Sequence, residues 1–154
     1  MKRTYALILV ALISVGSASA APGSQLGAGV FLGQPTGLSF GLDMAPAQWL
    51  DFKAAWDFAG GQNGFAIILQ GNWEMGFPGT FVIEGQDIVP FLGAGVQANV
   101  SDAGVNIGVH LPFGLDYRFR KAPLELFLEL GLDIYLFPAT DFSASGGLGI
   151  RYRF

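Results

Sequence analysis

The chain has 154 residues, which is enough for a single domain, and only 13% of them are charged against 51% that are hydrophobic. Average soluble domains carry about 25% charged residues, so much of the surface of this protein is not expected to face water. The absence of cysteine excludes disulfide bonds, thiolate metal sites, a cysteine nucleophile and a lipidated cysteine.

The first twenty residues are typical of a secretion signal peptide. Lys2 and Arg3 give it a positive start, residues 5–15 form an apolar stretch, and residues 18–20 (Ala-Ser-Ala) form a small-residue cleavage site. The apolar stretch is shorter than the about 20 residues that a transmembrane helix needs. We therefore expect residues 1–20 to be removed on export.

The remaining chain, residues 21–154, is expected to form one domain. It keeps six of the eight basic residues, because Lys2 and Arg3 are lost, against twelve acidic ones. This acidic balance argues against nucleic acid as a partner. No other segment is long and apolar enough to be a membrane helix, so a membrane location would have to rest on strands.

Beyond the signal segment, hydrophobicity alternates with a period of two, which is the pattern of β-strands and not of helices. In chain order, the expected strands are Leu26–Gly33, Gly37–Met44, Trp49–Phe58, Phe65–Met75, Ile88–Val100, Val105–Arg120, residues 124–136 and Phe142–Phe154. Turn-forming residues separate them, and a tight hairpin is expected at residues 34–36 (Gln-Pro-Thr). Eight strands at this spacing predict an all-β fold, an eight-stranded antiparallel up-and-down barrel.

Alternation alone does not say which face of the barrel is outside. A soluble, lipocalin-like periplasmic carrier of an apolar ligand would have an apolar interior, whereas a transmembrane β-barrel has an apolar exterior. An eight-stranded barrel has an interior only just wide enough for side chains to fill, and the apolar face here is bulky on nearly every strand. The long segments also reach the about 9–11 residues that a membrane-spanning strand needs. We therefore expect a transmembrane barrel with the glycine-rich, polar face inside.

The last strand carries a resemblance to a known class of protein. Four apolar or aromatic residues alternate there with glycine and arginine: Leu148, Ile150, Tyr152 and Phe154. This resembles the C-terminal strand of bacterial outer-membrane barrels, which implies that Tyr152 and Phe154 form an assembly signal for the barrel assembly machinery. From Leu26 to Phe154 the chain resembles the small OmpA/OmpX-type barrels. The resemblance implies a location in the bacterial outer membrane of a Gram-negative envelope, in contact with its lipid.

A group of charged residues is expected inside the lumen, toward the periplasmic end of the barrel. Hairpin register should place Glu125 and Glu129 between four arginines: Arg118, Arg120, Arg151 and Arg153. Charges in a narrow lumen must be paired, because an unpaired buried charge is costly. We favour an ion-pair network that fills the barrel; a gate, or a path for protons or solutes, is the functional alternative.

His110 is the only histidine, and its parity places it in the lumen. Asp133 or Tyr135 on the next strand could hydrogen-bond to it. A metal site normally needs several nitrogen, sulfur or oxygen ligands, and no partner histidine or cysteine exists, so neither a metal nor a cofactor is expected. Lipid-modifying barrel enzymes use histidine with serine, but Ser39 and Ser101 lie far from His110 in the expected fold. No catalytic residue is assigned.

Two features concern the ends of the strands. Aromatic side chains gather there and are expected to form girdles at the membrane surfaces, with Trp49 as an inward-facing exception. The longest connection, residues 76–86, falls on the periplasmic side, where turns are usually short. It could extend a strand or fold over the mouth of the barrel.

Together these patterns predict a monomeric, non-enzymatic outer-membrane barrel with a structural, envelope-stabilising role. A lipid-modifying outer-membrane enzyme and a soluble carrier of an apolar ligand remain as alternatives.

Overall fold

The computed structural model describes residues 25–57, 66–102 and 104–154. The predicted signal segment, residues 1–20, and the predicted strand ends Phe58 and Phe65 lie outside these ranges. The described residues form nine strands: β1 (Leu26–Gln34), β2 (Thr36–Ala45), β3 (Gln48–Asp57), β4 (Ala66–Gly76), β5 (Phe81–Ile83), β6 (Gln86–Ser101), β7 (Gly104–Arg118), β8 (Leu124–Phe137) and β9 (Asp141–Arg153). In that part of the chain, no helix is long and apolar enough to cross a membrane.

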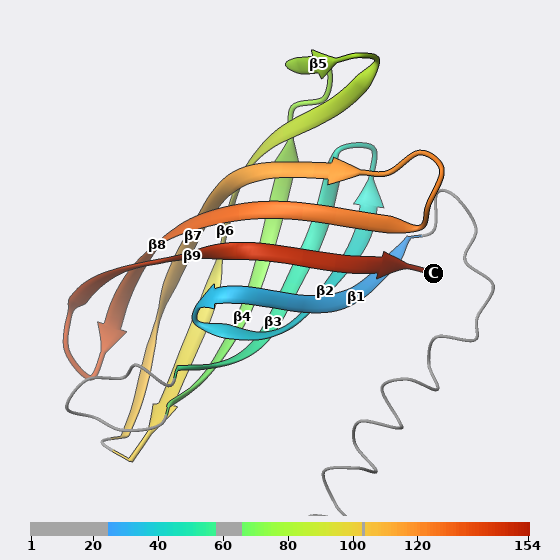
Figure 1. The fold of residues 1–154 in the computed structure, drawn as a ribbon. Coiled ribbons are helices and arrows are strands. Elements are labelled where there is room, and N and C mark those ends of the chain that lie inside the picture. The colour runs from blue at the N-terminus through green and yellow to red at the C-terminus, as the bar shows by residue number, and fades with distance from the viewer. Residues whose placement is uncertain (1–24, 58–65, 103) are drawn as a thin grey trace, which may run out of the picture.

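Eight of these strands close into an antiparallel barrel (Figure 1). Except for β4 and β5, strands that are neighbours in sequence pair with one another; β4 pairs with β6, and β1 pairs with β9. The short β5 pairs only with the start of β6, so it extends the sheet locally and is not a ninth strand of the closed barrel. The predicted eight-stranded up-and-down barrel is confirmed.

The strands are staggered around the barrel. Following the paired residues from Ile88 on β6 through the other seven strands leads back to β6 at Ala98, ten residues further along. Such a stagger requires the strands to tilt by about 35–45°. Below, "terminal rim" denotes the end of the barrel where β1 begins and β9 ends, and "distal rim" the opposite end, with the β1–β2 and β8–β9 turns.

The two faces of the barrel have opposite character. On β4, buried residues alternate with outward ones: Asn72 and Glu74 are buried, whereas Leu69 and Trp73 are exposed. The same segregation holds for the other long strands, so the exterior is apolar and the interior is polar. This confirms the predicted orientation, and it is the reverse of the apolar interior that a lipocalin-like carrier would need.

The predicted turns are mostly where they were expected. Pro35 alone separates β1 from β2, and the Thr36 hydroxyl donates a hydrogen bond of 2.8 Å to the Gly33 carbonyl, as a tight hairpin requires. The strand predicted over Val105–Arg120 ends earlier, at Arg118. Its last two residues fall in the exposed connection to β8, because Pro123 cannot continue the ladder and the chain turns before it.

The predicted 76–86 connection does extend a strand. Phe81 pairs with Ile88 and Ile83 pairs with Gln86, so β5 and the start of β6 form a hairpin. Glu84 and Gly85 connect them with positive φ angles of 51° and 76°, as expected for a two-residue type I′ turn. The hairpin projects beyond the ends of the neighbouring strands (Figure 1).

Glycine is required where a side chain from another strand crosses the lumen. A Cβ at Gly149 on β9 would overlap the ring of Phe127 on β8, and that ring is buried against Phe31. Gly149→Ala is therefore expected to lower the free energy of unfolding by about 1–3 kcal/mol through overpacking. Urea titration of the folded barrel in phospholipid vesicles measures this.

Gly71 on β4 provides the matched control for this prediction. A Cβ there would contact only the Phe52 ring, at an ordinary 3.4 Å. Gly71→Ala is expected to leave stability almost unchanged. If Gly149→Ala were equally harmless, the lumen beside Phe127 would have room for the added methyl group and the prediction would be wrong.

Candidate functional site

Polar and charged side chains fill the lumen, which is the candidate functional site. They project inward from every strand of the barrel except β1, whose inward positions are mainly glycine and Phe31. The buried polar residues are Ser39, Asp51, Lys53, Gln70, Asn72, Glu74, Gln97, His110, Asp116, Glu125, Glu129, Asp133, Arg151 and Arg153. Alternation along a closed ladder sends every second side chain into the lumen, so the polar residues gather there once the apolar face is outside.

Glu125 on β8 is the centre of one ion-pair cluster. Arg151 and Arg153 on β9 each donate to one of its carboxylate oxygens, at 2.6 and 2.9 Å. Arg118 on β7 lies 3.5 Å away on the other side. Strand register produces this arrangement, because Glu125 is paired with Arg151 in one ladder and with Arg118 in the other. Four of the six predicted cluster residues are thus brought together.

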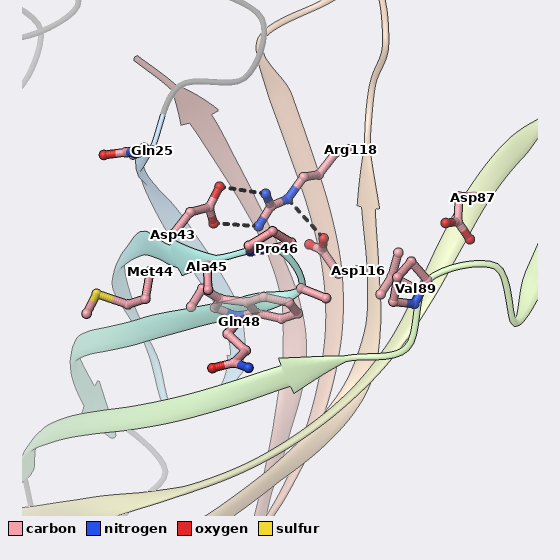
Figure 2. Close-up of a pocket in the computed structure, with 13 residues that line it drawn as sticks. Gln25, Asp43, Met44, Ala45, Pro46, Gln48, Asp87, Val89, Asp116 and Arg118 are labelled. Carbon is pink, nitrogen blue, oxygen red and sulfur yellow. Dashed lines mark hydrogen bonds and ion pairs between the residues drawn. The ribbon is translucent and has the colours of Figure 1, made fainter.

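Arg118 also reaches across the barrel to β2. Its two terminal nitrogens donate to the two carboxylate oxygens of Asp43 at 2.8 and 2.9 Å, and its Nε donates to Asp116 at 3.2 Å (Figure 2). The guanidinium group lies 5.5 Å from the ring of Trp49, which faces inward as predicted. These residues line a cavity of about 520 Å³ at the terminal rim.

Glu129 belongs to a different cluster from the one predicted. The structure pairs it with Lys53 on β3, at 2.8 Å, and not with the arginines. The reason is its position in the β8–β9 register: Glu129 lies four residues further along β8 than Glu125, toward the distal rim, where its paired residue on β9 is Gly147 and not an arginine. Lys53 also donates to Asp51 at 2.5 Å, and Asp51 in turn forms an ion pair with Arg151.

Arg120 is the second correction. It lies beyond the end of β7 in the exposed connection to β8, so it does not enter the lumen. The predicted assembly residues Tyr152 and Phe154 lie at the terminal rim with their rings 5.3 Å apart, edge to face. The Phe154 amide donates to the Leu26 carbonyl at 2.8 Å, which holds the end of the chain against β1.

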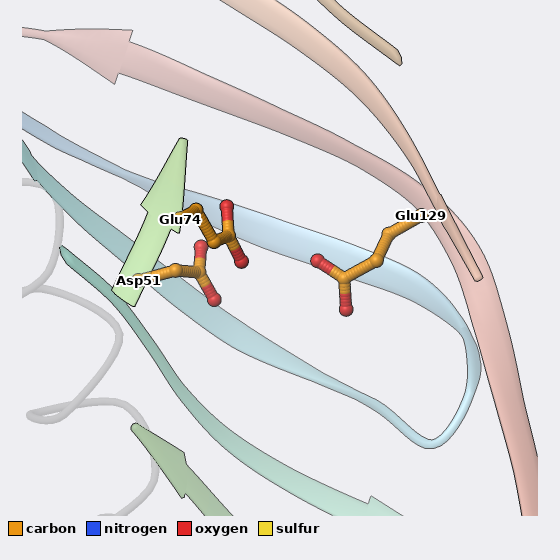
Figure 3. Close-up of side chains that lie close together, drawn as sticks. All are labelled: Asp51, Glu74 and Glu129. Atoms are coloured by element: carbon orange, nitrogen blue, oxygen red, sulfur yellow. The ribbon is translucent and has the colours of Figure 1, made fainter. Parts of the chain in front are cut away.

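Three carboxylates approach one another in the middle of the lumen. Oxygens of Asp51, Glu74 and Glu129 lie within 4.8 Å of one another, a spacing that could hold a cation. Figure 3 shows Asp51 and Glu74 on one wall and Glu129 reaching toward them from the other. The ammonium group of Lys53 already lies against two of them, and the Trp49 indole donates to Glu74 at 2.5 Å. Lys53 therefore gives Asp51 and Glu129 a counter-charge, whereas Glu74 accepts only the neutral indole N–H.

His110 is fully buried, with 0% of its surface exposed. Its Nδ1 lies 2.6 Å from Asp133 on β8, one of the two partners that the sequence offered, and Asp133 is the residue paired with His110 in the ladder. Its Nε2 lies 3.6 Å from Glu129 and has no hydrogen-bond partner within the described residues.

Of the two serines considered for His110, Ser39 accepts hydrogen bonds from Arg151 at 2.7 and 3.0 Å, and Ser101 donates to the Gly104 carbonyl at the end of β6. Ser145 is the nearer serine, since its hydroxyl and the His110 ring both lie against Gly131, but no hydroxyl hydrogen-bonds to Nε2 in the described residues, as a nucleophile–base pair requires.

The side chains of the lumen connect opposite walls. Three strands separate β3 from β8 in either direction around the barrel, and the same is true of β2 and β7. The Lys53–Glu129 and Arg118–Asp43 ion pairs therefore span the barrel diameter. Beside the first pair, the rings of Phe31 and Phe127 stack at 5.9 Å, with the Lys53 ammonium 5.3 Å from the Phe31 ring.

The layer formed by Phe31, Lys53, Phe127, Glu129 and Arg151 separates two cavities. One is the terminal-rim cavity, and the other, of about 460 Å³, opens at the distal rim. The polar residues that line the distal cavity are neutral or acidic, among them Asn99, Asn106, Asp133, Tyr135 and Ser143. The residues of the separating layer line neither cavity.

The sequence interpretation missed most of the cross-barrel partners. Asp43, Asp51, Lys53, Glu74 and Asp116 all join the network, and all have the parity of the inward face of their strands. Parity could have placed them in the lumen. It could not have matched Asp43 or Lys53 to their partners on the opposite wall, because those contacts depend on the stagger. Glu74, by contrast, lies opposite Trp49 in the β3–β4 register, and Asp116 is bound by Arg118 on its own strand.

No protein-family model matches the chain, and no curated protein matches it. Two solved structures are similar. The N-terminal β-barrel domain of Pseudomonas aeruginosa OprF has a TM-score of 0.62 at 16% sequence identity, covering 84% of this chain and 95% of that one. Neisserial surface protein A has a TM-score of 0.55 at 14% identity, covering 84% of this chain and 93% of that one. The chain has the fold of the small, eight-stranded, OmpA-type outer-membrane barrels.

Proposed function

We propose that this protein is a monomeric outer-membrane β-barrel with a structural role in the envelope of a Gram-negative cell, and that its lumen is closed to solutes. An exterior of exposed leucine, isoleucine, valine and phenylalanine supports a lipid environment. The predicted signal segment, residues 1–20, would export the chain. The fold shared with the barrels of OprF and Neisserial surface protein A supports the same location.

The proposal of a closed lumen rests on two ion pairs that span the barrel diameter, Lys53–Glu129 and Arg118–Asp43. Lys53 and Glu129 meet at 2.8 Å with side chains 0% and 4% exposed, so no open path passes between them. The stacked Phe31 and Phe127 rings occupy the space beside them. Buried and paired charges of this kind hold a fixed arrangement, because breaking one pair leaves an uncompensated charge.

A lipid-modifying enzyme is the weaker alternative. It would require His110 to meet a serine and an acid at an opening that lipid can reach. Asp133 supplies the acid, but the histidine is buried inside the lumen, between the Asp133 and Glu129 carboxylates of β8. The apolar substrate would have to enter a polar, closed interior.

The location is tested by cell fractionation and heat-modifiability. We expect the protein in the outer-membrane fraction, with a different mobility in unboiled and boiled samples on a denaturing gel. Recovery in the soluble periplasmic fraction without detergent would contradict the proposal.

The closed lumen is tested by conductance. Purified, folded protein inserted into planar phospholipid bilayers is expected to give no conductance steps, whereas a trimeric porin in the same apparatus does. Arg120→Ala, a change outside the lumen, serves as the control variant and should behave in the same way. Reproducible steps from the wild-type protein would mean that the lumen conducts and that the cross-barrel ion pairs open.

A further inference from the structure

The β5 hairpin presents apolar side chains that the barrel does not bury. All three residues of β5 are more than half exposed: Phe81 by 52%, Val82 by 58% and Ile83 by 59%. Phe77, in the connection from β4, is also exposed. Exposed apolar groups that gather in this way mark a contact with a partner or with lipid.

Register shows which face of the hairpin these side chains occupy. Phe81 and Ile83 are paired with Ile88 and Gln86, and these even-numbered residues of β6 share the outward face that carries Leu92. Val82 is paired with Asp87, on the inward face. Phe81 and Ile83 therefore continue the apolar exterior of the barrel past the terminal rim.

The level of the hairpin is fixed by its contacts with β7. Ile88 is paired with Phe81 on one side and with Tyr117 on the other, so the three lie on one line across the sheet. The Tyr117 hydroxyl donates to Gln86 at 2.9 Å, and its ring packs edge to face on Phe119 at 4.7 Å. Tyrosine with a polar tip and an apolar ring is typical of the headgroup level of a membrane.

From this continuity we infer that the β5 hairpin is a membrane anchor, which places Phe81 and Ile83 in the headgroup–acyl boundary of the lipid leaflet at the terminal rim. The partner is a zwitterionic glycerophospholipid surface. The only charge at the tip of the hairpin is that of Glu84, in the turn. Asp87 is turned inward, where it accepts the Gly79 amide at 3.0 Å. A basic patch, which an anionic surface would need, is absent from residues 77–88.

The anchor follows from the strand pattern. A barrel strand that ended at Gly76 would end at the rim; the hairpin instead adds outward-facing apolar residues on one side of the barrel only. The apolar surface that contacts the bilayer therefore extends further past the terminal rim beside β4 and β6 than it does on the other side of the barrel. This goes beyond the proposed envelope role, although it requires the barrel to lie in a bilayer.

The absence of cysteine from the sequence makes a direct test possible. Single cysteines introduced by Phe81→Cys, Val82→Cys and Ile83→Cys would each carry a nitroxide spin label, with residues 21–154, the chain without its predicted signal segment, folded into phosphatidylcholine vesicles. The ratio of accessibility to oxygen over accessibility to a water-soluble nickel chelate is then measured at each position. Each labelled protein is first checked for the mobility shift of the folded barrel.

We expect this ratio to be several-fold higher at positions 81 and 83 than at position 82, since only the outward-facing labels would reach lipid. If the ratios at positions 81 and 83 are as low as that of a label in water, the hairpin stands in water and the inference is overturned. Spin–spin broadening at position 81 that disappears on dilution with unlabelled protein would show contact with a second copy, and would overturn it as well.

Two further labels separate this inference from the orientation of the barrel. Leu130→Cys, on the outward face of β8, should report lipid, and Thr140→Cys, in the exposed β8–β9 turn, should report water. A water-like value at position 130 would contradict the membrane barrel itself. A lipid-like value there with water-like values at 81 and 83 would contradict the anchor alone.

Discussion

Replacing Lys53 by alanine is expected to lower the free energy of unfolding by about 3–5 kcal/mol, because it leaves buried carboxylates without their counter-charge. The ammonium group lies 2.5 Å from Asp51 and 2.8 Å from Glu129, and both pairs are buried. Arg151 remains beside Asp51, but in the described residues Glu129 would keep only His110, at 3.6 Å. Urea titration in phospholipid vesicles, followed by tryptophan fluorescence, measures the loss.

The control is the double variant Lys53→Met with Glu129→Gln. It removes both charges of the cross-barrel pair and keeps similar volumes, so its stability should lie between those of the wild type and Lys53→Ala. If Lys53→Ala is as stable as the wild type, the ion pair does not hold the opposite walls of the barrel together.

Glu125→Ala is expected to have an effect of the same size, about 3–5 kcal/mol, because it removes the shared partner of several buried guanidinium groups. Arg151 and Arg153 donate to separate oxygens of this carboxylate. Glu125→Gln should lose nearly as much as Glu125→Ala, since it keeps the size of the side chain but not the charge. The same urea titration compares the three proteins.

Arg120→Ala is the matched control for the Glu125 variants. Arg120 is exposed in the connection to β8, and such surface changes usually alter stability by less than about 0.5 kcal/mol. A loss at Arg120 comparable with that at Glu125 would place Arg120 back in the cluster from which the structure excludes it.

The sequence was sufficient to predict the fold because one physical pattern dominates it. Alternation over Val105–Arg120 and its neighbours predicted the strands, and the bulk of the apolar face predicted which side is outside. The ends of the strands were less accurate. Arg118 ends β7 although the alternation continues to Arg120, and the 76–86 connection contains β5, whose three residues are too few to show a period.

The candidate site could be predicted only for pairs of adjacent strands. Glu125 beside Arg151, and His110 beside Asp133, follow from hairpin register, which turn positions set. Lys53 beside Glu129 joins strands on opposite walls, and that contact follows from the stagger of the closed barrel. A shift of two residues in the stagger would give Lys53 a different partner while leaving every hairpin intact.

The seam between β1 and β9 has a consequence for the order of folding. Gly29 is paired with Arg151, and the Arg151 guanidinium binds Ser39, so contacts separated by more than a hundred residues complete the wall. Loop-closure entropy must be overcome before such distant contacts form, which makes them slow. Until β9 arrives, both edges of the sheet have unpaired backbone groups that can capture another chain. The chain therefore stays prone to aggregation until its final strand, β9, pairs with β1. This closure of the barrel is expected to be the slowest step in its folding.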